Sequence, residues 1–188
     1  MKLQLILATL ISYVLALQKC ADVSNTFCVN GVTKDGMTTF TIHSSEPGWA
    51  GIGLGKEMKD SHIIVGWING QNTPSVVSLL GEGHSLPKVA VTQQLNVVPL
   101  ADTKPSWSKL SFSFTRPVNT TFSGTIASNS DYIWAMGSDE PSNKDNIALA
   151  AFKKHTSKGS FQADFTKNAA WVGNPFCLLW VVIFTSLI

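Results

Sequence analysis

The sequence predicts an all-β fold: an antiparallel, immunoglobulin-like β-sandwich with almost no helix outside the two ends of the chain. Two observations carry this prediction. Short runs that are alternating, β-branched or aromatic recur along the chain, and Gly, Pro, Asn, Asp and Ser separate them. After the first 16 residues, no segment shows a sustained helical stripe of apolar residues.

The expected strands are short, and most are bounded by turn signals. In chain order they are Met37–Ile42, a glycine-rich run from Gly48, His62–Ile68, Val76–Leu80, Val89–Val98, Leu110–Phe114 and Tyr132–Met136. The turn signals are Asp35-Gly36, Glu46-Pro47-Gly48, Asn69-Gly70, Gly81-Glu82-Gly83 and Ser138–Asn143. Tryptophans 49, 67, 107 and 134 lie inside the predicted strands, where we expect most of them to pack in the core.

The N-terminal 16 residues have the layout of a secretory signal peptide. Lys2 gives a positive start, an apolar run follows from Leu3 to Leu15, and Ala16 is a small residue at the expected cleavage point. We therefore expect residues 1–16 to be removed and residues 17–167 to form one domain. About 150 residues are enough for one real core but not for two.

The C-terminal end is also apolar. Phe176–Ile188 is 13 residues long and spans about 20 Å as a helix, short of the roughly 30 Å hydrocarbon core. The small residues Asn168-Ala169-Ala170, a short spacer and this tail match a GPI-attachment signal over residues 168–188, with Asn168 as the expected attachment residue. A final core strand and a short tail anchor remain the alternatives. The expected location is the outer face of the plasma membrane.

Charge and cysteines restrict the partners and the compartment. Without Lys2, 13 of the 14 basic residues remain against 12 acidic ones, and Arg116 is the only arginine, which argues against nucleic acid. Cys20 and Cys28 form an even pair once Cys177 leaves with the tail, which favours a disulfide in an oxidising compartment. Asn119-Thr-Thr is the only glycosylation acceptor sequence, so we expect a glycan on Asn119.

The stretch from Gly48 to Gly70 carries the most chemical information. Gly51, Gly53 and Gly55 alternate, so one face of this strand lacks side chains, which often marks the close approach of another flat body. A haem is such a body. Met58 follows in a loop, where a flexible thioether can reach an iron, although a single Met usually only packs.

The run Gly48-Trp49-Ala-Gly51-Ile-Gly53, then Met58, Asp60 and a strand ending in Trp67-Ile-Asn-Gly70, resembles the DOMON domain. The resemblance covers roughly Cys20 to Phe165. It is closest to the haem-binding branch, which includes the cytochrome domain of cellobiose dehydrogenase and lipid-anchored DOMON proteins of plants. In that branch a Met after the glycine-rich strand and a late His bind the iron. The resemblance implies that Met58 and His155 are the ligands of a b-type haem, with Trp49 and the three glycines at the cofactor.

Other residues near these ligands have competing interpretations. His84 is the rival of His155, His62 is only four residues from Met58, and His43 lies in an alternating strand. Lys153, Lys154 and Lys158 surround His155. They form either a solvated loop or, through Lys154 and Lys158, a contact to haem propionates or to an acidic redox partner. No Cys-x-x-Cys-His occurs, so the haem would be bound non-covalently.

Met and His together fill both axial positions of an iron. The expected function is therefore outer-sphere transfer of single electrons rather than oxygenase or peroxidase chemistry, and the chain is expected to be a carrier rather than an enzyme. The expected partner is a redox protein or a small electron donor or acceptor. The alternative is a carbohydrate-binding or adhesive surface module without haem, in which aromatic residues stack on sugars. A substrate oxidoreductase is disfavoured, because no Gly-x-Gly-x-x-Gly opens a helix.

Overall fold

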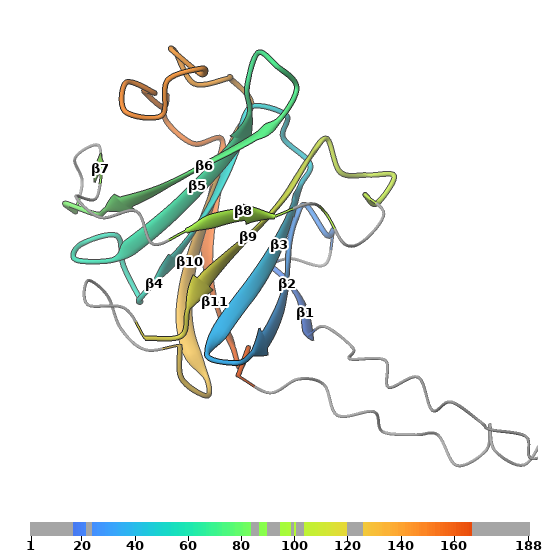
Figure 1. The fold of residues 1–188 in the computed structure, drawn as a ribbon, viewed down its shortest axis with the longest axis vertical. Coiled ribbons are helices and arrows are strands. Elements are labelled where there is room, and N and C mark those ends of the chain that lie inside the picture. Colours follow the sequence, from blue (N-terminus) through green and yellow to red (C-terminus); the bar gives the residue numbers. More distant parts are fainter. Residues whose placement is uncertain are drawn as a thin grey trace, which may run out of the picture.

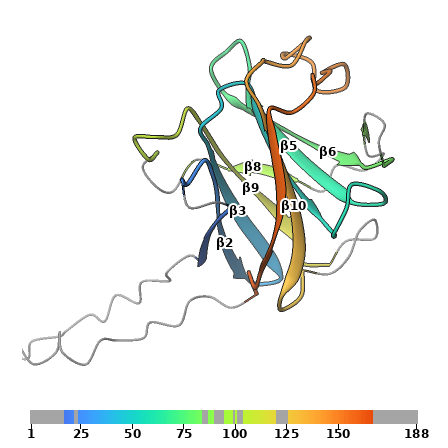
Figure 2. The same cartoon turned by 180° about the vertical axis from the view of Figure 1, so that it is seen from behind.

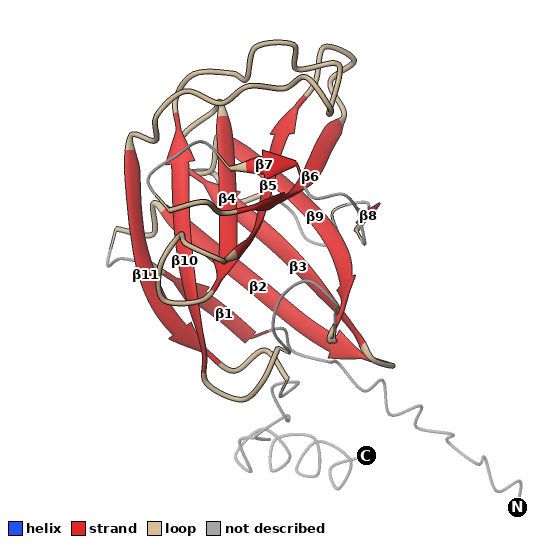
Figure 3. Cartoon of the chain, turned by 90° about the vertical axis from the view of Figure 1, so that its left-hand side faces the viewer, coloured by secondary structure: helices blue, strands red, loops and turns tan. Residues whose placement is uncertain are grey.

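Two antiparallel sheets pack face to face (Figure 1). The structure is a computed structural model that describes residues 17–21, 24–83, 87–89, 95–98, 100, 104–119 and 126–166. These residues form eleven strands and contain no helix, as the colouring by secondary structure shows (Figure 3). The predicted antiparallel sandwich is confirmed.

One sheet has five strands in the order β1-β2-β3-β9-β8. Their bounds are β1 Leu17–Cys20, β2 Phe27–Lys34, β3 Met37–Ser44, β9 Leu110–Pro117 and β8 Asn96–Val98. The hairpin between β2 and β3 turns at Asp35 and Gly36, whose φ angles of 51° and 75° are both positive. Positive φ at both positions is the backbone of a type I′ turn in a two-residue hairpin loop, which explains why Asp-Gly stands at the predicted turn.

The other sheet has six strands in the order β11-β10-β4-β5-β6-β7. Their bounds are β11 Ser157–Ala163, β10 Ser130–Gly137, β4 Trp49–Leu54, β5 His62–Ile68, β6 Pro74–Leu80 and β7 Lys88–Val89. β4 lies in the middle of this sheet and pairs with β10 on one side and β5 on the other. The glycine-rich strand is therefore flanked by neighbours on both edges.

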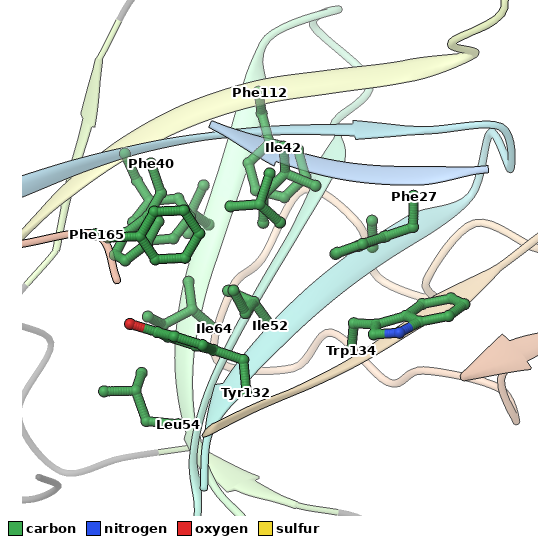
Figure 4. Packing of buried hydrophobic residues seen from close by; sticks show 14 of the residues in the cluster. Phe27, Phe40, Ile42, Ile52, Leu54, Ile64, Phe112, Tyr132, Trp134 and Phe165 are labelled. Atoms are coloured by element: carbon green, nitrogen blue, oxygen red, sulfur yellow. The ribbon is translucent and has the colours of Figure 1, made fainter. Parts of the chain in front are cut away.

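The main core fills the space between the two sheets (Figure 4). Alternate residues of β3 and β9 face it, and they pair in register as Phe40 with Phe114 and Ile42 with Phe112. A Cβ atom at Gly66 would collide with the Phe112 ring, so this glycine lets the two sheets approach closely. The period of two that predicted the strands thus also selects the core residues.

Two expectations about the strands were wrong. The run Val89–Val98 is not one strand: β7 pairs with β6 in the six-stranded sheet, whereas β8 pairs with β9 in the five-stranded sheet. Alternation looks the same on both sides of a change of sheet, so the pattern does not reveal it. Trp107 lies in a turn before β9 rather than in a strand, and its ring packs edge-on against His43.

The predicted disulfide is confirmed. Cys20 and Cys28 are directly opposite each other in the β1–β2 pair, and their sulfur atoms are bonded at 2.04 Å. Asn119 is exposed after β9, and its glycosylation stays a prediction. The expected signal peptide, the GPI tail and Asn168 lie outside the described residues. Within the described part of the chain, no helix has the length and apolarity needed to cross a bilayer.

Candidate functional site

The six-stranded sheet carries a second buried cluster on the face that points away from the main core. Trp49, Val65, Trp67, Val77 and Leu79 form it, and Trp67 and Val77 have no exposed surface. The outer face of an antiparallel sandwich sheet is normally polar and solvated. Here both faces of β4, β5 and β6 are apolar, so the outer face is built as a binding or packing surface. We call it the outer cluster.

The segment that joins β10 to β11, residues 138–156, covers one end of the outer cluster. Figures 1 and 2 show it in orange beside the end of β5 and the start of β6. Phe152 packs edge-on against both Trp49 and Trp67, with ring centroids 5.7 Å and 5.4 Å away. The Trp67 indole N–H donates to the carbonyl oxygen of Lys144 at 2.8 Å. These contacts hold the segment that carries His155 against the sheet.

Gly51 and Gly53 lie on the outer face, because Ala50, Ile52 and Leu54 of the same strand face the core. The bare strip expected from the sequence is only partly present. A Cβ at Gly53 would meet side-chain atoms of Ile133 at 2.8 Å and Ile63 at 3.2 Å, so branched neighbours lean over this glycine.

Gly51 is crowded in a similar way. A Cβ there would meet the Val65 side chain at 3.0 Å. Gly55 does not extend the strip, because β4 ends at Leu54 and Gly55 begins the following turn with φ +130°. The outer face at these glycines is therefore not bare: the branched side chains of neighbouring strands form its apolar surface.

Met58 is half-buried in the turn between β4 and β5. Its carbonyl oxygen accepts a hydrogen bond from the Ser61 N–H at 3.3 Å and lies against Gly81, just after β6. Val77 and Leu79 of β6 face outward, so a side chain at Gly81 would project to the same side. This contact places the Met58 turn beside the outer cluster.

His155 is half-buried just before β11. The next residue, Thr156, donates its N–H to the Met136 carbonyl at 2.9 Å and so fixes the end of the segment to β10. Burial lowers the pKa of His155, the charges of Lys158 and Lys154 lower it further, and a backbone hydrogen bond opposes the shift. The neutral imidazole, which is the form that binds metals, is thereby favoured.

Met58 and His155 lie at opposite ends of β4. At one end Leu54 pairs with His62, which follows the Met58 turn; at the other end Trp49 pairs with Gly137, beside the segment that leads to His155. The five residue steps between Trp49 and Leu54 correspond to roughly 17 Å of strand. The structure therefore brings both predicted ligands to the same sheet, one at each end of the outer cluster.

Trp49 adds a polar atom to this apolar face. Its indole N–H is buried and has no hydrogen-bond partner among the described residues. A buried donor without a partner costs about 1–3 kcal/mol, so such a group generally serves a ligand, a water or another part of the chain. Lys158, opposite Ala135 in the β10–β11 pair, also lies on this face and is exposed, as is Lys154.

The rival histidines lie elsewhere. His62 points into the sandwich, where its Nε2 hydrogen-bonds the Ser78 hydroxyl. His43 is buried on the far side of the five-stranded sheet, with its Nδ1 2.8 Å from the Ser111 hydroxyl. His84 lies outside the described residues. Of the described histidines, His155 alone lies in the segment that covers the outer cluster.

Sequence reasoning missed several residues of this face, among them Val65, Val77, Leu79, Gly81 and Phe152. A signal existed for the first three: β5 and β6 are apolar at successive positions, which is typical of strands buried on both faces. Phe152 stands in an irregular segment, and Gly81 was assigned only to a turn. No periodic pattern marks residues of that kind.

Comparison with known proteins gives a consistent result. Residues 28–171 match the family described as the cytochrome domain of cellobiose dehydrogenase. Among curated proteins no significant match was found.

Two solved structures show the same fold. One is the cytochrome b domain of pyranose dehydrogenase from Coprinopsis cinerea, with a TM-score of 0.60, 13% identity, and coverage of 78% of this chain and 83% of that one. The other is the cytochrome domain of Myriococcum thermophilum cellobiose dehydrogenase, with a TM-score of 0.59, 18% identity, and coverage of 83% and 81%.

Proposed function

Because the chain belongs to the family of the cytochrome domain of cellobiose dehydrogenase, we propose that it is a b-type cytochrome domain that carries single electrons. The observation that carries the proposal is the outer cluster, a buried apolar face with the Met58 turn beyond one end of β4 and the segment that leads to His155 at the other. In this proposal the Met58 sulfur and the His155 imidazole would hold the iron.

The residues of this face fit a haem. The partly buried residues packed against the outer cluster, Ile63, Ala135 and Phe152, would offer an apolar wall for a porphyrin, and the buried Trp49 N–H would offer a donor to a polar group at its rim. Lys154 and Lys158 supply positive charge near His155, which suits propionates. The chain has no Cys-x-x-Cys-His, so the cofactor would be haem b, held without a covalent bond.

This ligand pair determines which chemistry is open to the site. A bound haem supplies a one-electron couple of its iron. Met58 and His155 would hold the iron, and with two protein ligands it would have no open position for dioxygen or a substrate. A thioether ligand also favours the reduced state and raises the reduction potential. The domain would therefore exchange electrons with a redox protein or a small donor or acceptor rather than act as an enzyme itself.

We further propose that the domain works at the cell surface. Support comes from the Cys20–Cys28 disulfide, because such bonds persist in oxidising compartments. The layouts of residues 1–16 and 168–188 agree with secretion and with a GPI anchor attached at Asn168.

The visible absorption spectrum of the purified protein tests the cofactor and its ligands. We expect the bands of a low-spin b-type haem on reduction, and their loss in Met58→Ala and in His155→Ala. Met37→Ala is the matched control, because Met37 is half-buried at the end of the β2–β3 hairpin in the other sheet. A protein that stays colourless after haem is added would refute the proposal and leave the sugar-binding or adhesive alternative.

A further inference from the structure

The turn that carries Met58 is fastened to the end of β6. Asp60 donates its N–H to the Gly81 carbonyl at 3.0 Å, and Gly81 donates its N–H to the Ser61 carbonyl at 2.9 Å. The Ser61 hydroxyl also donates to the carbonyl of Glu57 inside the turn. These bonds continue the β5–β6 ladder by one step, so the chain around Gly81 is a fixed support for the turn.

At this support, the Met58 carbonyl occupies the place where a side chain at position 81 would stand. A Cβ at Gly81 would collide with the Met58 carbonyl oxygen, and it would lie 3.0 Å from the carbonyl carbon and 3.2 Å from Ile63 Cδ1. The obstacle is backbone, so no change of rotamer relieves it. Any side chain at position 81 must displace Met58 itself or break the bonds to Ser61 and Asp60.

We propose that Gly81 is a positioning residue for the axial sulfur: its bare α-carbon lets the Met58 turn close onto β6 and sets the thioether beside the outer cluster. This inference rests on the proposed ligation by Met58. If it is correct, Gly81 determines whether the iron has both protein ligands or has one coordination position free.

Gly81→Ala tests this assignment. We expect the variant to lose most of its low-spin ferrous spectrum, to bind carbon monoxide in the ferrous state, and to have a lower reduction potential, as Met58→Ala does. Gly83→Ala is the matched control. It strains a residue with φ +76° in the same loop, but its methyl would only approach Lys59 Cβ at 3.9 Å. It should keep the wild-type spectrum and exclude carbon monoxide.

A double variant shows whether Gly81 acts through Met58. Carbon monoxide affinity in Met58→Ala/Gly81→Ala should equal that of Met58→Ala alone within about twofold, because the interaction is already absent. If Gly81→Ala keeps the low-spin spectrum while Met58→Ala loses it, the role of Gly81 is refuted and the ligation stands. If Met58→Ala itself keeps the low-spin spectrum and excludes carbon monoxide, the proposed ligation by Met58 is refuted, and the role of Gly81 with it.

Folding is checked by circular dichroism of each variant. Should Gly81→Ala fail to fold, Ser61→Ala replaces it, because that change removes only the hydroxyl contact within the turn. Partial gain of carbon monoxide binding in Ser61→Ala supports the assignment, and full exclusion of the gas overturns it.

Discussion

Two histidines show how the surroundings of a single residue decide its role. Burial lowers the pKa of both, but His62 lies between the sheets beside the Ser78 hydroxyl, whereas His155 lies in the segment that covers the outer cluster. The sequence favoured His155 through its resemblance to a family motif. The structure turns His62 inward, and the rival His84 lies outside the described residues. Neither burial nor the direction of a side chain at a strand end follows from local sequence.

His62 makes the stability of the domain depend on pH. Burial, and then the charge of Arg116, lower its pKa from 6.5 to about 4, so the unfolded chain binds a proton over this range and the folded chain does not. The free energy of unfolding should therefore fall as the pH drops from 6.5 to 4, by up to about 1.4 kcal/mol per unit from this group. Urea unfolding of wild type and His62→Gln at several pH values measures it. Equal pH slopes in the two proteins would contradict the assignment.

Lys158 should influence His155 through its charge. Because Lys158 is one of the groups that lower the pKa of His155, Lys158→Gln should raise that pKa, and NMR titration of the haem-free protein would detect the rise. Lys34→Gln, at the β2–β3 hairpin, is the control and should leave His155 unchanged. A His155 pKa that does not respond to Lys158→Gln would show that the lysine is too well screened to matter.

At the scale of elements, alternation predicted most of the core strands but not which sheet faces are covered. Tyr132–Met136 lies within β10 and Leu110–Phe114 forms the first part of β9, because their apolar residues lie two apart and face one core. The outer cluster was not predicted, since its cover is an irregular segment and periodicity does not report tertiary contact. For the same reason the division of Val89–Val98 between two sheets was missed.

The covering segment should depend on Phe152. Its ring joins Trp49 and Trp67, so Phe152→Ala should lower the free energy of unfolding by about 2 kcal/mol, less than for a fully buried ring. Leu149→Ala, in the same segment but 61% exposed, should change it by less than about 0.5 kcal/mol. Chemical denaturation measures both. Equal effects of the two substitutions would mean that Phe152 does not hold the segment to the sheet.

At the scale of the whole molecule, the sandwich has two separate apolar layers. One apolar layer lies between the sheets and holds the fold, while the outer cluster lies on the other face of the six-stranded sheet, beside which we propose that the cofactor binds. The Cys20–Cys28 bond ties the edge strand β1 to β2 in the other sheet, away from the outer cluster. Compositional reasoning predicted this bond because only two cysteines precede the apolar tail.

If the C-terminal segment is a GPI signal, the fold does not need it. Deletion of residues 171–188 should then release folded, haem-binding protein into the medium, whereas the full chain stays on the cell surface and is freed by a phospholipase that cleaves GPI anchors. Immunoblots of medium and cells, with circular dichroism of the released protein, measure this. Retention of the truncated chain inside cells as misfolded protein would show that the tail belongs to the core.

The central claim is that one iron is held by the sulfur of Met58 and the imidazole of His155. X-ray absorption at the iron edge of the haem-loaded protein measures the ligands directly. We expect one sulfur neighbour of the iron in the wild-type protein, its loss in Met58→Ala and its retention in Met37→Ala. A wild-type spectrum with only nitrogen or oxygen neighbours would contradict the account.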